Sequence, residues 1–216
     1  MVSESSTPLT SEELDQAYQA EILDKDGKKQ TLGDLIKGKR VVLIFIRHFW
    51  CTNCQAYTYQ FGRSIPPSSL PEGTVVYVIG CGTSKPISAY VERTQSPYPI
   101  YADPSLELYK IFKFSRTLKG ANKNEKKDYM SQLGKGYLGA FNTITNGLFN
   151  NPSHSMESVR GPNDQNGGEL IIEKDGTCFY INRMQNTEDH TDLKELSGLI
   201  GARYVALSDK EKSFPN

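Results

Sequence analysis

Residues 41–61 read VVLIFIRHFWCTNCQAYTYQF, and this stretch decides the fold. It begins with an apolar run over residues 41–46, which predicts a buried strand. From Cys54 onward the residues follow a helical period, so that Cys54 and Phe61 share one face of a predicted helix. The pair Cys51 and Cys54 is therefore expected where a central strand turns into a helix.

The position of Cys51 at the start of that helix has a chemical consequence. Unpaired backbone N–H groups and the positive end of the helix dipole stabilise an anion there, so we expect a lowered pKa for the Cys51 thiol. The thiolate is the reactive form of cysteine. Cys54, one turn further along on the buried face, is placed to attack a mixed disulfide on Cys51 and resolve it. The pattern predicts a thiol-redox protein.

Two other interpretations of the cysteine pair are a zinc site and structural packing. A zinc site needs a second pair of ligands, but Cys81 and Cys178 are single and none of the three histidines makes a paired motif. Two cysteines can also pack as small apolar residues. A strand followed by Trp-Cys-x-x-Cys and an amphipathic helix is more specific than Cys-x-x-Cys alone, which favours redox use.

Composition narrows the class of protein. The chain has 216 residues and a formal net charge of zero, enough for one domain whose core needs no disulfide. It has no basic patch of the kind that binds nucleic acid, and its apolar runs are too short to span a membrane. The polar N-terminus shows no secretory signal. We therefore expect a cytoplasmic protein, where Cys-x-x-Cys is more often catalytic than structural.

Strands and helices alternate along the chain, which predicts an α/β fold. The expected elements are a hairpin over residues 20–32, a helical turn over 31–36, a strand over 74–80, a helix over 85–94 capped by Ser84, a strand over 98–101, a helix opened by Asp103-Pro104, a hairpin of strands 169–173 and 177–183, and a last helix capped by Thr191 or Asp192.

We divide the chain into an N-terminal extension (1–19, with 1–10 disordered), one domain (20–208) and a polar tail (209–216). Residues 115–166 form an insertion in the domain. Helices are expected there from a spaced set of apolar residues: Tyr129, Leu133, Leu138, Phe141 and Leu148. We interpret the insertion as a surface segment covering an edge of the core; the alternative is a lid or pocket wall near the cysteines.

Several motifs recur together in a known family. They are Arg47-His48-Phe49-Trp50-Cys51-Thr52-Asn53-Cys54, Val78-Ile79-Gly80, Ile100-Tyr101-Ala102-Asp103-Pro104, Leu108-Tyr109-Lys110, Gly167-Gly168 and the hairpin turn Lys174-Asp175-Gly176. Together they resemble the peroxiredoxin-like branch of the AhpC/TSA superfamily, over about residues 20–200. Arg183 and Asp189-His190 also resemble the C-terminal signature of that group.

The resemblance implies a thioredoxin-like fold. We expect a central mixed sheet with flanking helices, an N-terminal hairpin extension and a helical insertion before the terminal β-hairpin. Three places depart from the wider pattern. Phe45 replaces a buried aspartate that helps to deprotonate the resolving cysteine, and Gly168 stands where a cis-proline faces the cysteines. His48 stands where peroxiredoxins carry the threonine that orients the peroxide, so that hydroxyl is absent.

Candidate site residues follow from these patterns. Cys51 is the expected nucleophile and Cys54 the resolving cysteine. Arg47 and His48 are expected to stabilise the thiolate or polarise a peroxide as cationic donors. The alternatives are a surface ion pair at a strand end for Arg47 and a neutral histidine hydrogen-bonded in the turn for His48.

Supporting roles are assigned to five further residues. Thr52, Asn53 and Gly168 are expected to line the site, and Trp50 to shield the dithiol or simply to pack in the core. Cys81 is either a third redox partner or, as we favour, a packed cysteine. By contrast, Cys178 is expected to be structural, and Asp189-His190 to form a cap and turn rather than a catalytic pair.

The activity implied is reduction of a peroxide or disulfide through a Cys51/Cys54 cycle. No bound cofactor or metal is expected; thioredoxin or glutathione, and ultimately NADPH, would supply electrons. One alternative is an enzyme of the prostamide/prostaglandin F synthase kind, acting on an organic endoperoxide held by the insertion. Another is a non-enzymatic redox sensor or binding scaffold. A homodimer is left open.

Overall fold

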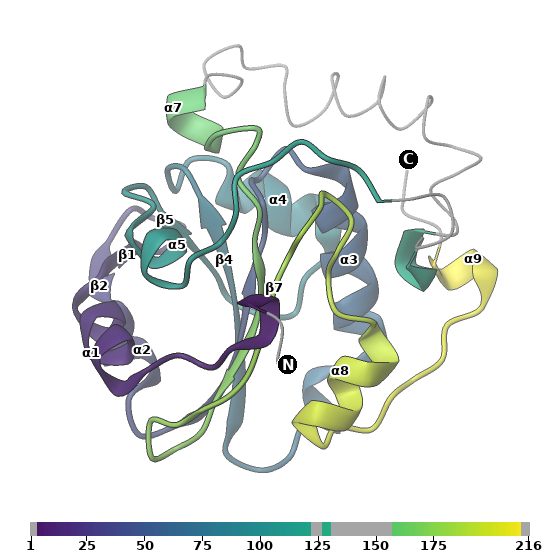
Figure 1. The fold of residues 1–216 in the computed structure, drawn as a ribbon. Helices are drawn as coiled ribbons and strands as arrows, with labels where there is room; N and C mark the ends of the chain where they lie inside the picture. Colours follow the sequence, from purple (N-terminus) through teal and green to yellow (C-terminus); the bar gives the residue numbers. More distant parts are fainter. Residues whose placement is uncertain (1–3, 122–126, 131–156, 213–216) are drawn as a thin grey trace.

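The structure is a computed structural model that describes residues 4–121, 127–130 and 157–212 (Figure 1). In this part of the chain a seven-stranded mixed sheet has the order β2-β1-β5-β4-β3-β6-β7. The strands are β1 (Glu21–Leu23), β2 (Lys29–Thr31), β3 (Arg40–Phe45), β4 (Thr74–Cys81), β5 (Ile100–Asp103), β6 (Gly168–Ile172) and β7 (Cys178–Arg183).

Strand β3 lies in the middle of the core sheet. It pairs in parallel with β4, which pairs in parallel with β5, and it pairs antiparallel with β6. Both predicted hairpins, β1–β2 and β6–β7, are confirmed as antiparallel pairs. The predicted α/β fold with a mixed sheet is therefore confirmed.

Helices cover both faces of the sheet (Figure 1). They are α1 (Ser11–Gln19), α2 (Leu32–Ile36), α3 (Thr52–Ser64), α4 (Ile87–Thr94), α5 (Glu107–Ile111), α7 (Glu157–Arg160), α8 (Leu193–Ile200) and α9 (Asp209–Lys212), with 3-10 turns η1 (Glu4–Ser6), η2 (Pro67–Ser69) and η3 (Asp128–Met130).

Alternating side chains of β3 divide the core into two layers. Val42 and Ile44 pack with α3, α4 and α8 on one face. Leu43 and Phe45 pack with α1, α2 and α5 on the other, where the Phe45 ring meets Tyr109 edge to face at 5.2 Å. The strand is buried on both sides, which explains why its sequence is a continuous apolar run.

Two expectations at the ends of elements are wrong. Residues 4–10 were expected to be disordered, but Leu9 is buried and the Thr7 carbonyl accepts a hydrogen bond from Arg183 Nη1 at 2.8 Å. Helix α4 starts at Ile87 after Pro86, and no side chain caps it, so Ser84 is not its cap. The polar tail contains α9, whose Lys212 Nζ lies 2.7 Å from Asp128 Oδ2.

The insertion is described only in part. The helices predicted around Leu133, Leu138, Phe141 and Leu148 lie outside the described residues. At its two ends Arg116 and Gln165 form an isolated antiparallel bridge. Within it, the Tyr129 ring packs against Tyr57 of α3 at 5.1 Å.

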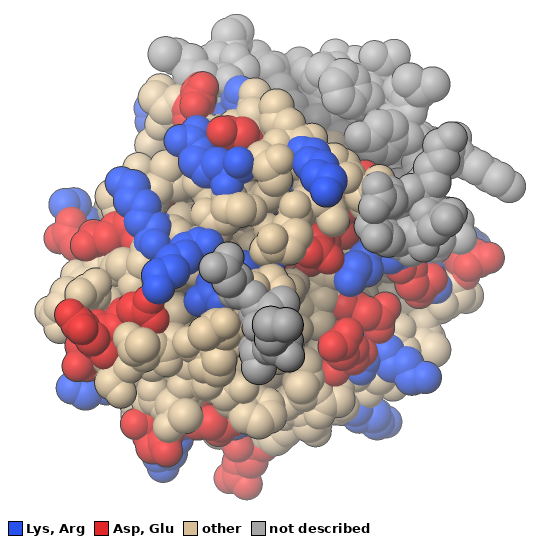
Figure 2. All heavy atoms as spheres, viewed as in Figure 1, with Lys and Arg blue, Asp and Glu red and all other residues tan. Residues whose placement is uncertain are grey.

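The surface carries both signs of charge, as the face in Figure 2 shows. Among the described residues, the helices are all too short or too polar to cross a lipid bilayer.

Candidate active site

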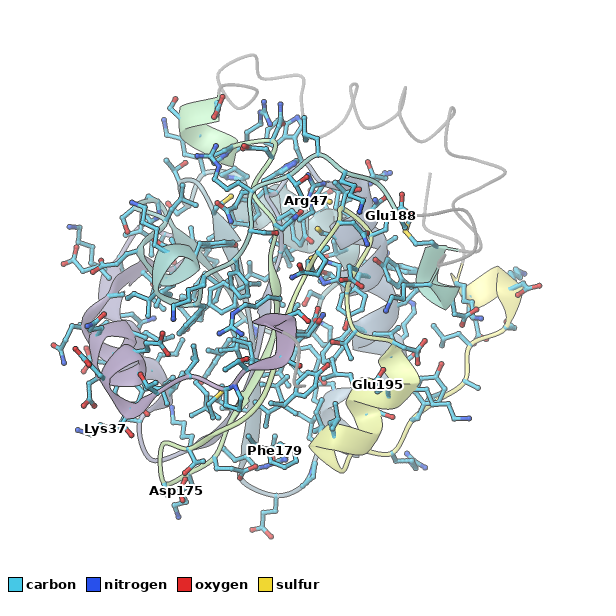
Figure 3. The ribbon with its side chains drawn as sticks, viewed as in Figure 1. Lys37, Arg47, Asp175, Phe179, Glu188 and Glu195 are labelled. Carbon is cyan, nitrogen blue, oxygen red and sulfur yellow. The ribbon has the colours of Figure 1, made fainter. Side chains whose placement is uncertain are left out.

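The turn from β3 into α3 lies at the carboxyl end of the parallel strands. Figure 3 shows Arg47 at this end of the sheet, opposite the end that carries Asp175 and Phe179. Below the turn, the Phe49 ring packs edge to face on Tyr90 at 5.5 Å and lies over Gly80 of β4. A side chain at position 80 would place its Cβ 2.5 Å from Phe49 Cζ, so glycine there lets the ring lie on the sheet.

Cys51 caps helix α3, as the sequence predicts. Its sulfur accepts a hydrogen bond from the Cys54 backbone N–H at 3.3 Å, and its own N–H donates to the His48 carbonyl at 3.0 Å. Arg47 Nη1 lies 3.5 Å from the same sulfur. The Cys51 side chain is thus surrounded by donors that favour the thiolate.

The effect of these donors on the pKa of Cys51 outweighs the effect of burial. Burial raises the pKa of Cys51, but the hydrogen bond from the Cys54 thiol, the charge of Arg47, the Cys54 N–H and the charge of His190 lower that pKa to about 6. Cys51 is therefore mostly a thiolate at neutral pH, although its residue is only 4% exposed.

Arg47 is buried, and residues from the segment before β6 hold its guanidinium. Its Nε donates to Asn166 Oδ1 at 3.0 Å and its Nη2 to the Asn163 carbonyl at 2.6 Å. The alternative of a surface ion pair is therefore wrong. Asn163 and Asn166 were not predicted as site residues, because they come from the segment before β6 and only the fold brings them to Arg47.

Cys54 lies deeper, with no exposed surface. The Arg47 backbone N–H donates to its sulfur at 3.3 Å, and His190 Nε2 lies 3.4 Å from that sulfur. Burial, the hydrogen bond to Cys51 and the negative charge of Cys51 raise the pKa of Cys54 well above its usual value. The two sulfurs therefore differ in state, with a thiolate at Cys51 and a thiol at Cys54.

His190 lies beside the cysteine pair, although the sequence did not predict it there. It was expected in a cap and turn, yet it is fully buried with Nδ1 2.5 Å from Glu169 Oε1. Its ring stacks on Tyr57 at 4.2 Å with planes 11° apart. One signal was available: Glu169 is a carboxylate directly before the apolar residues of β6, where a buried charge needs a partner.

Glu169 is buried, and both of its carboxylate oxygens are hydrogen-bonded. The other carboxylate oxygen, Oε2, accepts bonds from the Thr191 N–H at 3.0 Å, the Thr191 hydroxyl at 2.7 Å and Asn182 Nδ2 at 3.0 Å. Burial raises the pKa of Glu169, but the charge and hydrogen bond of His190 and the bonds from Asn182 and Thr191 lower it overall. Glu169 is therefore an anion that holds His190.

His48 does not act as a cation. Burial, together with the charges of Arg47 and Arg160, lowers its pKa to about 3, so its imidazole is neutral. The expectation of a cationic donor at this position is wrong. The alternative, a neutral histidine hydrogen-bonded in the turn, holds for the neutral state only, because the buried Nδ1 of His48 has no hydrogen-bond partner among the described residues. The Cys81 thiol donates to the Arg47 carbonyl at 2.8 Å, and burial raises its pKa. This geometry supports the packed interpretation of Cys81 and supports the backbone of the turn.

The remaining candidates lie around the pair in different ways. Trp50 is half-buried against the core layer that contains both cysteines, and Thr52 is the partly exposed first residue of α3. Asn53 Nδ2 donates to the Thr187 carbonyl at 3.2 Å, which ties α3 to the segment before His190. Gly168 does not face the cysteines: a Cβ there would meet the Asn182 carbonyl and the Phe114 ring, in the opposite core layer.

Comparison with known proteins places this chain in a family. The family model described as AhpC/TSA antioxidant enzyme matches residues 63–186, more than half of the chain. The chain belongs to this family. The matched residues begin after Cys54, so the match rests on strands β4 and β5, the insertion and the terminal hairpin rather than on the cysteine pair.

Curated proteins that are similar to this chain in sequence agree with its placement in the family. Human Peroxiredoxin-like 2C is 29% identical over 191 residues, covering 88% of this chain and 80% of the relative. The Arabidopsis thaliana Thioredoxin-like protein AAED1, chloroplastic, is 30% identical over 96 residues, covering 43% of this chain and 37% of that protein.

Solved structures share the fold. Peroxidoxin BcpB from Mycobacterium tuberculosis superposes with a TM-score of 0.51 at 12% identity, covering 84% of this chain and 88% of its own. The Xanthomonas campestris Bacterioferritin Comigratory Protein superposes with a TM-score of 0.53 at 9% identity, covering 87% of this chain and 91% of its own. The predicted thioredoxin-like, peroxiredoxin-like fold is confirmed.

Proposed function

We propose that the protein is a thiol-dependent peroxidase in which Cys51 is the nucleophile and Cys54 the resolving cysteine. The observation that carries the proposal is the Cys51 sulfur, whose pKa is lowered to about 6 beside Arg47 Nη1 at 3.5 Å. The AhpC/TSA family supports the same class of thiol oxidoreductase.

In the first step the Cys51 thiolate attacks the terminal oxygen of a hydroperoxide. The S–O bond forms, the O–O bond breaks, and the departing alkoxide takes up a proton to give an alcohol, or water from hydrogen peroxide. Cys51 becomes a sulfenic acid. The Arg47 guanidinium, fixed by Asn163 and Asn166, lies where it can stabilise negative charge on the oxygens. It takes the place of the hydroxyl that His48 does not supply.

In the second step the Cys54 sulfur attacks the Cys51 sulfur. The S–S bond forms and the oxygen leaves as water. Two external thiols then restore the dithiol and become a disulfide themselves. We propose thioredoxin or glutathione as that donor, with NADPH as the ultimate source of electrons and the cytoplasm as the reducing compartment. The chemistry of this cycle uses no bound cofactor.

Single-turnover oxidation of the reduced protein tests the proposal. Trp50, the single tryptophan, lies beside the pair and serves as a fluorescent reporter. Hydrogen peroxide, an organic hydroperoxide and a small oxidised disulfide are mixed in turn with the protein, and mass spectrometry locates the bond formed. We expect fast loss of two thiols, a Cys51–Cys54 bond and a faster reaction with one of the peroxides.

Two variants make the result specific. Cys51→Ser is expected to abolish the reaction, whereas Cys178→Ser, in β7 away from the site, is expected to retain it. A faster reaction with the small disulfide would instead indicate a disulfide reductase. Full activity of Cys51→Ser, or a bond that excludes Cys51, would refute the assignment.

A further inference from the structure

The contact between His190 and Cys54 is not used by the cycle described so far. His190 comes from the segment between β7 and α8, 136 residues after Cys54, and its Nε2 lies 3.4 Å from the Cys54 sulfur. Both residues are fully buried. An imidazole at this distance from a buried thiol, with a carboxylate on its other nitrogen, has the arrangement of a base with its orienting group.

We propose that His190 is the catalytic base for Cys54, and that Glu169 is the positioning residue that fixes its ring and stabilises its charged form. The inference rests on the proposed function, because it supplies the proton acceptor for the second step. Glu169 Oε1 holds Nδ1 at 2.5 Å, which leaves Nε2 to face the sulfur.

The proton can be followed through the step. The Cys54 S–H proton passes to His190 Nε2, and the resulting thiolate attacks the sulfur of the Cys51 sulfenic acid. The S–O bond breaks, the departing hydroxide takes a proton from solvent to become water, and the imidazolium returns its proton to solvent. During reduction, an external thiolate attacks the Cys51 sulfur, and His190 protonates the Cys54 thiolate that leaves.

The order of events follows from the charge on Cys51. While Cys51 is a thiolate, its negative charge and its hydrogen bond are among the causes that raise the pKa of Cys54. Formation of the neutral sulfenic acid removes that charge. The Cys54 thiol then gives up its proton more easily, so oxidation of one cysteine activates the other.

The groups around His190 allow it to change charge inside the core. Glu169 faces it from β6, Cys54 and Tyr57 face it from α3, and Tyr129 faces it from η3 with its ring 6.1 Å away. Burial raises the pKa values of both tyrosines, so they stay neutral. Glu169 is therefore the carboxylate beside the ring, and an imidazolium there forms a neutral ion pair.

This arrangement also accounts for Phe45. The aspartate that the wider thioredoxin pattern places before the tryptophan would help to deprotonate the resolving cysteine, but Phe45 lies in the core layer opposite the cysteines. In this protein the proposed base, His190, comes from the segment after the β6–β7 hairpin, and Glu169 of β6 holds its ring against Cys54.

Rapid mixing with peroxide, followed by acid quenching and mass spectrometry, separates the two steps. At pH 8, where Cys51 is already ionised, the rate of sulfenic acid formation depends on peroxide concentration, and the rate of disulfide formation does not. His190→Gln is expected to keep the first rate and slow the second by about 10²-fold, so that the sulfenic acid accumulates and is trapped by dimedone.

Glu169→Gln tests the positioning role by a readout that misfolding would not reproduce. The amide can still accept from Nδ1, but it does not stabilise the imidazolium. The second step should therefore slow, and its pH dependence should move to lower pH because His190 becomes a weaker base. Glu173→Gln, directly after the same strand and in a half-buried ion pair with Arg40, is the matched control and should change neither quantity.

The outcomes distinguish this inference from the proposed function. No sulfenic acid or disulfide in the wild-type protein would refute the proposed function itself. Two normal steps in the wild-type protein, with an unchanged second rate and pH dependence in both variants, would overturn only the role of His190. A slower second step with an unchanged pH dependence in Glu169→Gln would show that Glu169 only supports the structure, and would overturn its proposed role.

Discussion

At the scale of single residues, the site consists of one charge pair and one hydrogen-bonded pair. Arg47 balances the Cys51 thiolate across 3.5 Å, and His190 lies 2.5 Å from Glu169. Cys54 lies between the two pairs and stays protonated. Each pair is buried and further hydrogen-bonded, which is the condition under which charges persist in a core.

The first prediction concerns Arg47→Gln. Because the Arg47 charge is among the causes that lower the pKa of Cys51 to about 6, its loss should move that pKa toward the value of free cysteine, about 8.5. The thiolate fraction at pH 7 should fall several-fold. The pH dependence of Cys51 alkylation by iodoacetamide, followed by mass spectrometry, measures the change.

Arg63→Gln is the control for Arg47→Gln. Arg63 lies in the last turn of α3 and donates to Gln95 Oε1 at 2.6 Å, at the far end of the helix from Cys51. Its removal should leave the midpoint of Cys51 alkylation near pH 6. Equal midpoints in both variants would show that the helix terminus alone, without Arg47, sets the thiolate.

At the scale of elements, the sequence predicts what is local. The apolar run of β3 and the helical period of α3 are properties of neighbouring residues, so both elements and the capping position of Cys51 follow from them. The contact of His190 with Cys54 joins residues 136 apart, and no local pattern contains it. The pKa of His48 is likewise lowered because the fold buries its ring and brings Arg47 and Arg160 near it.

The second prediction tests how β4 supports the turn that carries the cysteines. Gly80→Ala would place a methyl group 2.5 Å from the Phe49 ring, which must then move. Overpacking of this kind costs about 1–3 kcal/mol. Urea denaturation should show that loss of stability, and Cys51 alkylation at pH 7 should slow because the turn from Arg47 to Cys51 shifts with Phe49.

Gly198→Ala is the matched substitution. Gly198 lies inside α8, and a Cβ there has no atom within 4 Å. The same change should therefore raise stability by about 0.5–1 kcal/mol, as expected for glycine in a helix interior, and leave alkylation unchanged. A neutral effect of Gly80→Ala on both measurements would contradict the supporting role of β4.

At the scale of the whole molecule, the lowered pKa of Cys51 links the redox state to folding stability. The pKa is about 6 in the folded protein and about 8.5 in the unfolded chain. Between these values the unfolded chain binds one proton more than the folded protein. The free energy of unfolding of the reduced protein therefore rises with pH across this window. The stabilisation that Cys51 contributes is fully present above about pH 8.5 and is lost as the pH falls through 6.

The third prediction follows from that linkage. Urea denaturation under reducing conditions, at a series of pH values from 6 to 9, should show an increase for the wild-type protein that exceeds that of Cys51→Ser by on the order of 3 kcal/mol. Serine does not titrate in this range, so subtraction removes the contribution of the groups that do not interact with Cys51. Cys178→Ser should behave as the wild type.

The same stabilisation of the Cys51 thiolate favours the dithiol over the disulfide, so external thiols should reduce the Cys51–Cys54 bond more readily as the pH rises above 6. Parallel curves for the wild type and Cys51→Ser would show that the pKa of Cys51 is the same in the folded protein and in the unfolded chain, and would remove the basis for both the stability change and the ease of reduction.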